Sequence, residues 1–200
     1  MRAFIALELP EKIRTSLREN LVSGEIKTEI GKIQRELKIA GVQAKWVKPE
    51  IAHLTLAFLG SITPNQVEPI GKILEVSASQ IKPISLSLSK IGCFPSLAKA
   101  KIIFVSLEGE LEKLNDLAKE IRHGLKREKI YFDEKPFVNH ITLGRIKKRQ
   151  NLIRLIEKIK VKRVEFVVSE VSLTKSILTE SGPTYKILKS CSLSSPKKTV

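Results

Sequence analysis

The sequence predicts a fold that mixes strands and helices and consists of two similar halves. Apolar residues recur at strand-like and helix-like intervals in turn, and this order of elements appears twice along the chain. A short motif also repeats, as His-Leu-Thr-Leu over 53–56 and His-Ile-Thr-Leu over 140–143. An internal duplication of this kind would let two lobes pack about a pseudo-twofold axis, with both histidine strands facing one groove.

In the first half, alternating apolar residues predict strands, and apolar residues three or four apart predict helices. Proline or glycine marks several boundaries, as at Pro10, Pro49 and Gly60. Gly24 and Gly31 are expected to break the first helix, because glycine is a poor helix former. The expected elements are a strand over 2–9, a helix over 13–37, a short strand over 45–47, a strand over 53–59, a helix over 63–74 and a strand over 84–88.

A loop that contains Gly92, Phe94 and Pro95 is expected to separate the halves. The same spacing rules then predict a second series of elements. We assign residues 1–190 to a single bilobal domain and residues 191–200 to a polar, basic tail without a function. The expected elements are a strand over 102–107, an amphipathic helix over 111–125, a strand over 138–146, a helix over 152–159, a closing strand over 164–173 and a final strand over 185–188.

The composition is that of a globular protein of the cytoplasm. With 42% hydrophobic residues among 200, the chain is long enough to bury a core without disulfides. No apolar run approaches the roughly 20 residues that a membrane helix needs, and the N-terminal apolar stretch is too short for an export signal. Cys93 and Cys191 lack the spacing of a metal or redox motif, so we expect reduced thiols, with a disulfide between them as the alternative.

The formal net charge of +15 favours polyanionic partners, and RNA is the leading candidate. The alternative is a lysine-rich, well-solvated surface of the kind that heat-adapted proteins often carry. Charge supports nucleic-acid binding without establishing it.

The repeated motif is the main indication of function. In a strand, residues i and i+2 point to the same face, so His53 with Thr55, and His140 with Thr142, each offer an imidazole and a hydroxyl on one surface. Two facing imidazoles supply a base that activates water and an acid that protonates a leaving oxygen, as phosphodiester hydrolysis requires. The unperturbed histidine pKa of about 6.5 allows both protonation states near neutrality. The threonine hydroxyls would bind the non-bridging phosphate oxygens.

The histidines also admit other interpretations. A single buried histidine beside a threonine is usually structural, but the duplication argues against this. A metal site would need further ligands, and the only aspartates are Asp116 and Asp133, so metal-free chemistry is favoured. Motifs for nucleotide triphosphates, dinucleotides and acyl hydrolysis are absent. His123, on the predicted helix over 111–125, is expected to be a surface residue.

These motifs resemble those of the 2H phosphoesterase superfamily, in particular its RNA 2′,3′-cyclic phosphodiesterase branch, long called 2′-5′ RNA ligases. The resemblance covers nearly the whole chain. The paired histidine motifs, with Phe-Leu-Gly after the first and Arg145 after the second, are its most specific part. The other matching segments are 2–7, 45–47, Phe94-Pro95, Leu173, Ser176, Leu178 and 182–185.

The resemblance implies a bilobal α+β fold, with two antiparallel sheets lining a central groove and helices outside. It also implies hydrolysis of RNA 2′,3′-cyclic phosphate to a 2′-phosphate without a cofactor or metal. His53 would be the proton donor, His140 the proton acceptor, and Arg145 would bind the substrate phosphate. The chain departs from the family in its longer segment between 10 and 45, and in Val138-Asn139, where proline often precedes the histidine.

Further expectations concern partners and alternative functions. The substrate is expected to be RNA ending in a 2′,3′-cyclic phosphate, with tRNA halves as one candidate, and the protein is expected to be a monomer. Reversible 2′-5′ ligation and a non-catalytic basic RNA-binding module are the alternatives. Trp46 and Phe94 could stack on a base, although packing in the core is at least as well supported.

Overall fold

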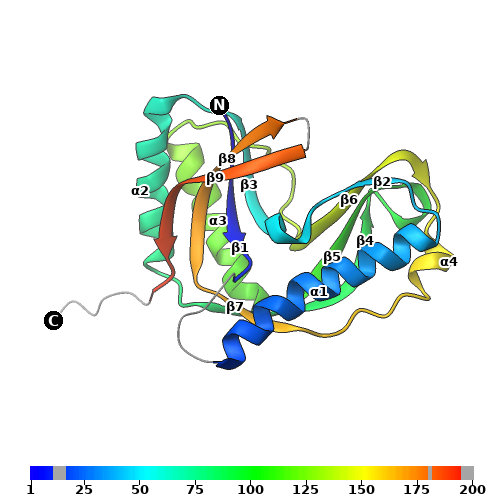
Figure 1. Cartoon of the computed structure of the whole chain (residues 1–200). Coiled ribbons are helices and arrows are strands. Elements are labelled where there is room, and N and C mark those ends of the chain that lie inside the picture. Colours follow the sequence, from blue (N-terminus) through cyan, green and yellow to red (C-terminus); the bar gives the residue numbers. More distant parts are fainter. Residues whose placement is uncertain (11–16, 180–181, 195–200) are drawn as a thin grey trace.

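The computed structural model describes residues 1–10, 17–179 and 182–194 of the chain, and of 17–23 only the backbone. Strands and helices are mixed along both halves of the chain (Figure 1). The elements are β1 (Arg2–Glu8), α1 (Leu17–Ile39), β2 (Ala44–Trp46), β3 (His53–Ser61), α2 (Val67–Ala78), β4 (Ile84–Phe94), β5 (Ala100–Gly109), α3 (Leu111–Arg127), β6 (His140–Gln150), α4 (Ile153–Ile156), β7 (Glu165–Val168), β8 (Glu170–Thr179) and β9 (Gly182–Ser192).

The described strands pair antiparallel in the order β7-β4-β5-β6-β3-β1-β8-β9, with β2 beside β6. The expected α+β class with antiparallel strands is therefore confirmed. The two halves, β7-β4-β5-β6 and β3-β1-β8-β9, are joined by one pair of residues, Leu54 of β3 and Ile141 of β6. The two expected sheets thus form one continuous sheet, in which a single residue pair connects the two central strands.

The helices lie on the outside of the sheet, as expected (Figure 1). α2 and α3 pack beside the β1-β8-β9 half, and α1 runs along the other half. The i, i+3 and i+4 spacing of Leu114, Leu117 and Ile121 gives α3 one fully buried face. Among the described helices, none combines the length and hydropathy needed to cross a membrane.

The expected break of the first helix at glycine is wrong, because α1 runs without interruption from Leu17 to Ile39. A glycine inside a helix costs about 1 kcal/mol relative to alanine. The burial of Ile30, Ile33 and Leu37 against the sheet outweighs that cost. Residues 13–16 of the expected helix lie outside the described part of the chain.

Two other elements differ from expectation. The helix over 152–159 is one α-turn, Ile153–Ile156, and continues as i to i+3 turns in which Lys158 and Ile159 donate to Leu155 and Ile156. The expected closing strand over 164–173 divides at Ser169 into β7, which pairs with β4, and β8, which pairs with β1. A continuous run of β-type residues does not show that its two ends pair with different strands.

The expected loop at Gly92 and Phe94 is part of β4, which extends to Phe94 and pairs with β5. Gly92 is required there by a close approach rather than by a turn. A Cβ atom at this position would lie 2.4 Å from Cζ of Phe104, so only glycine leaves room for that ring.

Cys93 and Cys191 are both free thiols, so the alternative of a disulfide between them is not realised. Burial raises the pKa of the Cys93 thiol to about 11. A thiol with this pKa is protonated at neutral pH and behaves as a small apolar side chain.

Candidate active site

The two histidine motifs meet at the centre of the sheet. They lie at the starts of β3 and β6, and the pair Leu54–Ile141 connects these strands. An antiparallel register through this pair sets His53 opposite Thr142, and it sets His140 opposite Thr55. The four side chains predicted from the motifs therefore come from two strands that are adjacent at this point.

Burial follows the alternation that the motifs predict. Leu54 and Ile141 are buried in the core, whereas both histidines and both threonines are only partly buried. The first nine residues of β3 and β6 show the same order of buried, intermediate and exposed positions. The two strands thus present equivalent faces to the groove.

Each imidazole is fixed by the same local hydrogen bond. Nδ1 of His53 lies 2.9 Å from the carbonyl oxygen of Ile51, and Nδ1 of His140 lies 2.7 Å from that of Val138. A carbonyl oxygen can only accept, so Nδ1 is the protonated donor in both rings. This leaves Nε2 of each histidine as the nitrogen that exchanges a proton with a substrate.

Two aromatic rings flank His53. The ring of Phe4 stacks on the imidazole with 4.6 Å between centroids, and Tyr185 contacts it edge-on at 5.2 Å. Tyr185 also packs against Phe4, at 5.1 Å between centroids. Two further rings flank His140, one edge-on and one tilted.

Phe94 meets the His140 ring edge-on at 5.1 Å, and Phe104 lies 5.2 Å from it. Each histidine is therefore flanked by two aromatic rings, Phe4 and Tyr185 at His53 and Phe104 and Phe94 at His140. Of these four rings, only Tyr185 carries a hydroxyl.

The two histidines differ in their charged neighbours. Burial lowers the pKa of both imidazoles. The carboxylate of Glu8 partly opposes this effect at His53 by raising its pKa. At His140, the positive charges of Arg145 and of His53 lower the pKa further. Burial is thus the largest effect at both rings, and the neighbouring charges act in opposite directions, with a carboxylate that raises the pKa of His53 and a guanidinium that lowers the pKa of His140.

Arg145 reaches the site because of an irregularity in β6. Strict alternation would turn residue i+5 of the motif away from His140. Between Thr142 and Gly144 the pairing with β5 shifts by one residue, as in a β-bulge, and such a shift changes the face that the following side chains occupy. The positive charge of Arg145 lowers the pKa of His140 and of Tyr185, so it acts on both sides of the groove.

Glu8 is held in place by hydroxyl groups of β8. Its Oε1 accepts hydrogen bonds from Ser172 Oγ at 2.9 Å and from Thr174 Oγ1 at 3.5 Å. Both hydroxyl residues are buried. Glu8 also lies directly opposite His53 in the pairing of β1 with β3, so its carboxylate is positioned beside the imidazole.

Phe4, Glu8 and Tyr185 were not identified as site residues from the sequence. A signal for the first two exists, because Phe-Ile-Ala-Leu-Glu over 4–8 returns after 100 residues as Phe-Val-Ser-Leu-Glu over 104–108. This second repeat brings equivalent strands beside the two histidines. Tyr185 has no counterpart in the repeat, and its only signal is that it lies in segment 182–185, which matches the family.

The two aromatic candidates for base stacking have different environments. Trp46 packs over Gly144, where a Cβ atom would lie 2.9 Å from its Cε3, and Lys38 lies over its ring. Phe94 lies at the site and contacts His140. His123 is exposed on α3, as expected. In the described ranges no three His, Cys, Asp or Glu side chains are grouped closely enough to hold a metal ion.

Comparison with known families gives two matches to one model, that of the LigT-like phosphoesterases. It matches residues 21–104 and again residues 105–185. Each match contains one histidine motif and covers most of one half of the chain. The internal duplication expected from the sequence is thus present in the family match.

Relatives of similar length exist in bacteria and archaea. A protein of Aquifex aeolicus named RNA 2′,3′-cyclic phosphodiesterase is 36% identical over 195 residues, covering 94% of this chain and 95% of the relative. A protein of the same name from Methanocaldococcus jannaschii is 33% identical over 193 residues, covering 94% and 99%. These matches confirm the resemblance inferred from the motifs.

Solved structures share the fold. A crystal structure from Thermus thermophilus superposes with a TM-score of 0.75 at 27% identity, covering 98% of this chain and all of that one. The LigT protein of E. coli, crystallised with 3′-AMP, gives a TM-score of 0.72 at 21% identity, covering 96% and 97%.

Proposed function

The chain belongs to the LigT-like phosphoesterase family, and on this premise we propose that it is an RNA 2′,3′-cyclic phosphodiesterase. It hydrolyses the cyclic phosphate at the end of an RNA and leaves a 2′-phosphate. The observation that carries the proposal is the pair of imidazoles on β3 and β6, each fixed through Nδ1 to a backbone carbonyl with Nε2 left for proton transfer. The names of the relatives from Aquifex aeolicus and Methanocaldococcus jannaschii support the same reaction.

The reaction needs two proton transfers, which the two histidines can divide. A water oxygen attacks phosphorus in line with the P–O3′ bond, and Nε2 of neutral His140 takes the water proton. The P–O3′ bond breaks, and its electron pair stays on O3′, which receives a proton from Nε2 of protonated His53. The phosphate remains attached at O2′, and solvent exchange resets both imidazoles. Because two imidazoles perform both transfers, no metal-bound water is needed.

The remaining groups of the site suit the charge that develops on phosphorus. The hydroxyls of Thr55 and Thr142 lie beside the two imidazoles and can donate hydrogen bonds to the non-bridging oxygens. The positive charge of Arg145 acts on the same space. Removal of one such donor is expected to cost about 1–3 kcal/mol of transition-state stabilisation.

The assignment of His53 as donor and His140 as acceptor rests on the unequal charges around them. Glu8 raises the pKa of His53, and Arg145 lowers that of His140. Tyr185, the other titratable group against the His53 ring, is neutral at pH 7, because burial raises its pKa above the ordinary value of 10. A carboxylate beside one imidazole and a guanidinium beside the other favour an imidazolium at His53 and a neutral ring at His140.

The proposal is tested with a short RNA that ends in a 2′,3′-cyclic phosphate, with tRNA halves as a second substrate. The expected product is the 2′-phosphate alone, identified by chromatography against 2′- and 3′-phosphate standards. Binding without hydrolysis would instead indicate an RNA-binding module, and a 3′-phosphate product would contradict the assigned mechanism. If RNA with a free 5′-hydroxyl is added, a joined product would reveal 2′-5′ ligation through the same groups.

A further inference from the structure

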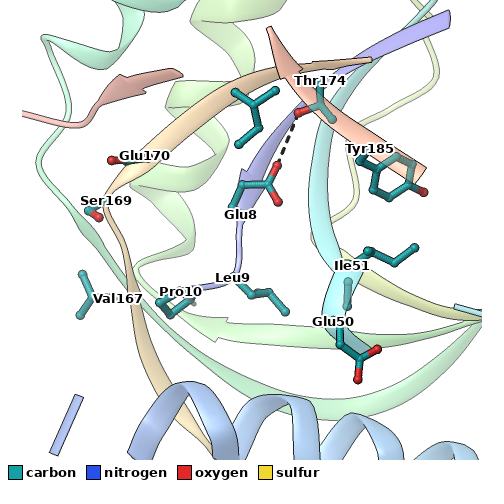
Figure 2. Close-up of a pocket in the computed structure, with 12 residues that line it drawn as sticks. Glu8, Leu9, Pro10, Glu50, Ile51, Val167, Ser169, Glu170, Thr174 and Tyr185 are labelled. Atoms are coloured by element: carbon teal, nitrogen blue, oxygen red, sulfur yellow. Dashed lines mark hydrogen bonds between the residues drawn. The ribbon is translucent and has the colours of Figure 1, made fainter. Parts of the chain in front are cut away.

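A cavity of about 410 Å³ is lined by residues of β1, β7, β8 and β9 and of the segment before β3 (Figure 2). This volume lies within the range of about 300–1,000 Å³ that is usual for small-molecule sites. Three carboxylates, one tyrosine and several aliphatic side chains line it. Those used in the argument are Glu8, Glu50, Ile51, Glu170, Tyr185 and Ile187.

The cavity adjoins the histidine site through residues that contact His53. The carbonyl of Ile51 holds the imidazole of His53, and Tyr185 contacts the same ring. Glu8 lies opposite His53 across β1 and β3. On the other side, the rings of Phe94 and Phe104 cover His140, and neither lines this cavity. This cavity therefore lies on the His53 side of the duplicated site and not on the His140 side.

We propose that this cavity binds the terminal nucleobase of the RNA substrate and selects bases with N–H donors on their Watson–Crick edge, guanine above all. The inference rests on the proposed function. If His53 protonates O3′, the ribose that carries the cyclic phosphate lies on the His53 side of the groove. Its base then extends toward the cavity rather than toward Phe94 and Phe104.

The negative charges that line the cavity favour the binding of a base and disfavour the binding of a phosphate. In a chain with a net charge of +15, this cavity is lined by Glu8, Glu50 and Glu170, and no lysine or arginine of the described ranges lines it. Ionised carboxylates accept hydrogen bonds and cannot donate them. They repel the RNA backbone but favour the edge of a base that offers donors. Single-stranded bases are recognised in this way, by hydrogen bonds to their edges and by stacking on aromatic rings.

One carboxylate oxygen of Glu8, Oε2, is available to a bound base. Its hydrogen bonds to Ser172 and Thr174 both use Oε1, and no partner of Oε2 is found within the described part of the chain. Guanine presents two adjacent N–H donors to a carboxylate, adenine and cytosine present one amino group, and uracil presents one N–H between two carbonyls. The ring of Tyr185 and the side chains of Ile51 and Ile187 supply apolar walls for the base.

The first experiment compares kcat/KM for the 2′,3′-cyclic phosphates of guanosine, adenosine, cytidine and uridine, and for the cyclic phosphate of 1-deoxyribose, which has no base. Guanosine should exceed uridine by about 10- to 100-fold, the discrimination typical of a hydrogen bond to a charged group. Ile187→Trp, which fills the cavity, should remove most of this preference and leave the base-free substrate within about twofold of wild type. Ile177→Trp is the matched control, because Ile177 is also a partly exposed strand residue but does not line the cavity.

The second experiment measures binding of guanosine and uridine 2′-monophosphates by calorimetry, where no proton transfer is needed. Wild type should bind the guanosine product more tightly. Glu8→Gln should shift the preference toward uracil, because a carboxamide offers one acceptor and one donor. Equal affinities in wild type, or a guanine preference that Ile187→Trp leaves intact, would overturn the base site. A folded protein that hydrolyses no cyclic phosphate, including the base-free one, would instead refute the proposed function, and the calorimetry would still decide on the cavity.

Discussion

Glu8 lies directly opposite His53 across β1 and β3, whereas Ser106 occupies the equivalent place opposite His140 across β5 and β6. The glutamate of the second repeat, Glu108, pairs instead with Ser87 of β4 and accepts a hydrogen bond from Ser89. The two halves repeat the same segments, but only one of them places a carboxylate beside its histidine. This difference can give two equivalent imidazoles unequal proton affinities.

Replacing Glu8 with glutamine should therefore change the pH profile of kcat/KM. The profile of the wild type should be bell-shaped, because one imidazole must be neutral and the other protonated. Glu8 raises the pKa of His53, so its removal lowers that pKa, and less His53 is protonated at a given pH. With His53 as the donor, the alkaline limb moves to lower pH. Glu108→Gln is the matched control and should leave both limbs in place.

Arg145→Ala should shift the acid limb of the same pH profile of kcat/KM. Arg145 lowers the pKa of His140, so its loss raises that pKa and shifts the acid limb to higher pH. If Glu8→Gln moved the acid limb and Arg145→Ala the alkaline limb, the assignment of donor and acceptor would be reversed. Rates across the acid and alkaline limbs with a cyclic mononucleotide provide the measurement.

Removal of either histidine should nearly abolish turnover without unfolding the protein. His53→Ala or His140→Ala deletes one proton-transfer partner and should lower kcat by about 10²-fold or more. Steady-state kinetics and circular dichroism provide the measurement. His123→Ala, at the exposed third histidine, should retain wild-type kcat. Near wild-type turnover in a folded variant of either motif histidine would exclude the two-histidine mechanism.

The hydroxyls of Thr55 and Thr142 should contribute separately. Valine keeps the β-branched shape that suits a strand but cannot donate to a phosphate oxygen. Thr55→Val and Thr142→Val should each cost about 1–3 kcal/mol of transition-state stabilisation, measured from kcat/KM. Thr184→Val, on an exposed position of β9, serves as the control. Full activity in both motif variants would leave the threonines with a structural role only.

The repeated His-x-Thr motif was sufficient to predict that the two histidine strands lie side by side with equivalent faces, because duplication and strand alternation are local properties of the sequence. Arg145 required the family resemblance, since strict alternation would turn it away from His140. The register shift in β6 that changes its face depends on pairing with β5, which the spacing of apolar residues does not encode. Tyr185 was missed for a similar reason. It reaches His53 only because β9 pairs with β8, and β8 with β1.

The division of the expected closing strand at Ser169 was not predicted for the same reason, because it depends on strand pairing. The run over 164–173 has uniform β propensity, yet its first part pairs with β4 and its second with β1. These two parts thereby belong to opposite halves of the sheet. The cavity beside His53 lies partly at this division, so the sequence could not predict it.

Chelation should have no effect on turnover. Each of the two proton transfers has an imidazole to perform it, so the reaction does not depend on a metal-bound hydroxide. EDTA-treated protein in EDTA-containing buffer should hydrolyse a cyclic mononucleotide at the rate of untreated protein. Loss of activity that zinc or manganese restores would contradict the metal-free mechanism.

Salt should distinguish the charge of the surface from the chemistry of the groove. An excess of 36 lysines and arginines over 21 acidic residues favours long RNA by releasing its counterions, so kcat/KM for long RNA should fall steeply as salt rises. A cyclic mononucleotide meets only the few groups of the site and should respond weakly.

Because Arg145 is proposed to bind the phosphate of both substrates, Arg145→Ala should lower both rates at low salt by a similar factor. The measurement is the slope of log kcat/KM against log salt for each substrate between about 50 and 200 mM, an interval over which a protein with several phosphate contacts loses much of its affinity. Equal slopes would mean that the basic surface is a solvated exterior that takes no part in RNA binding, even if hydrolysis of the cyclic phosphate were intact.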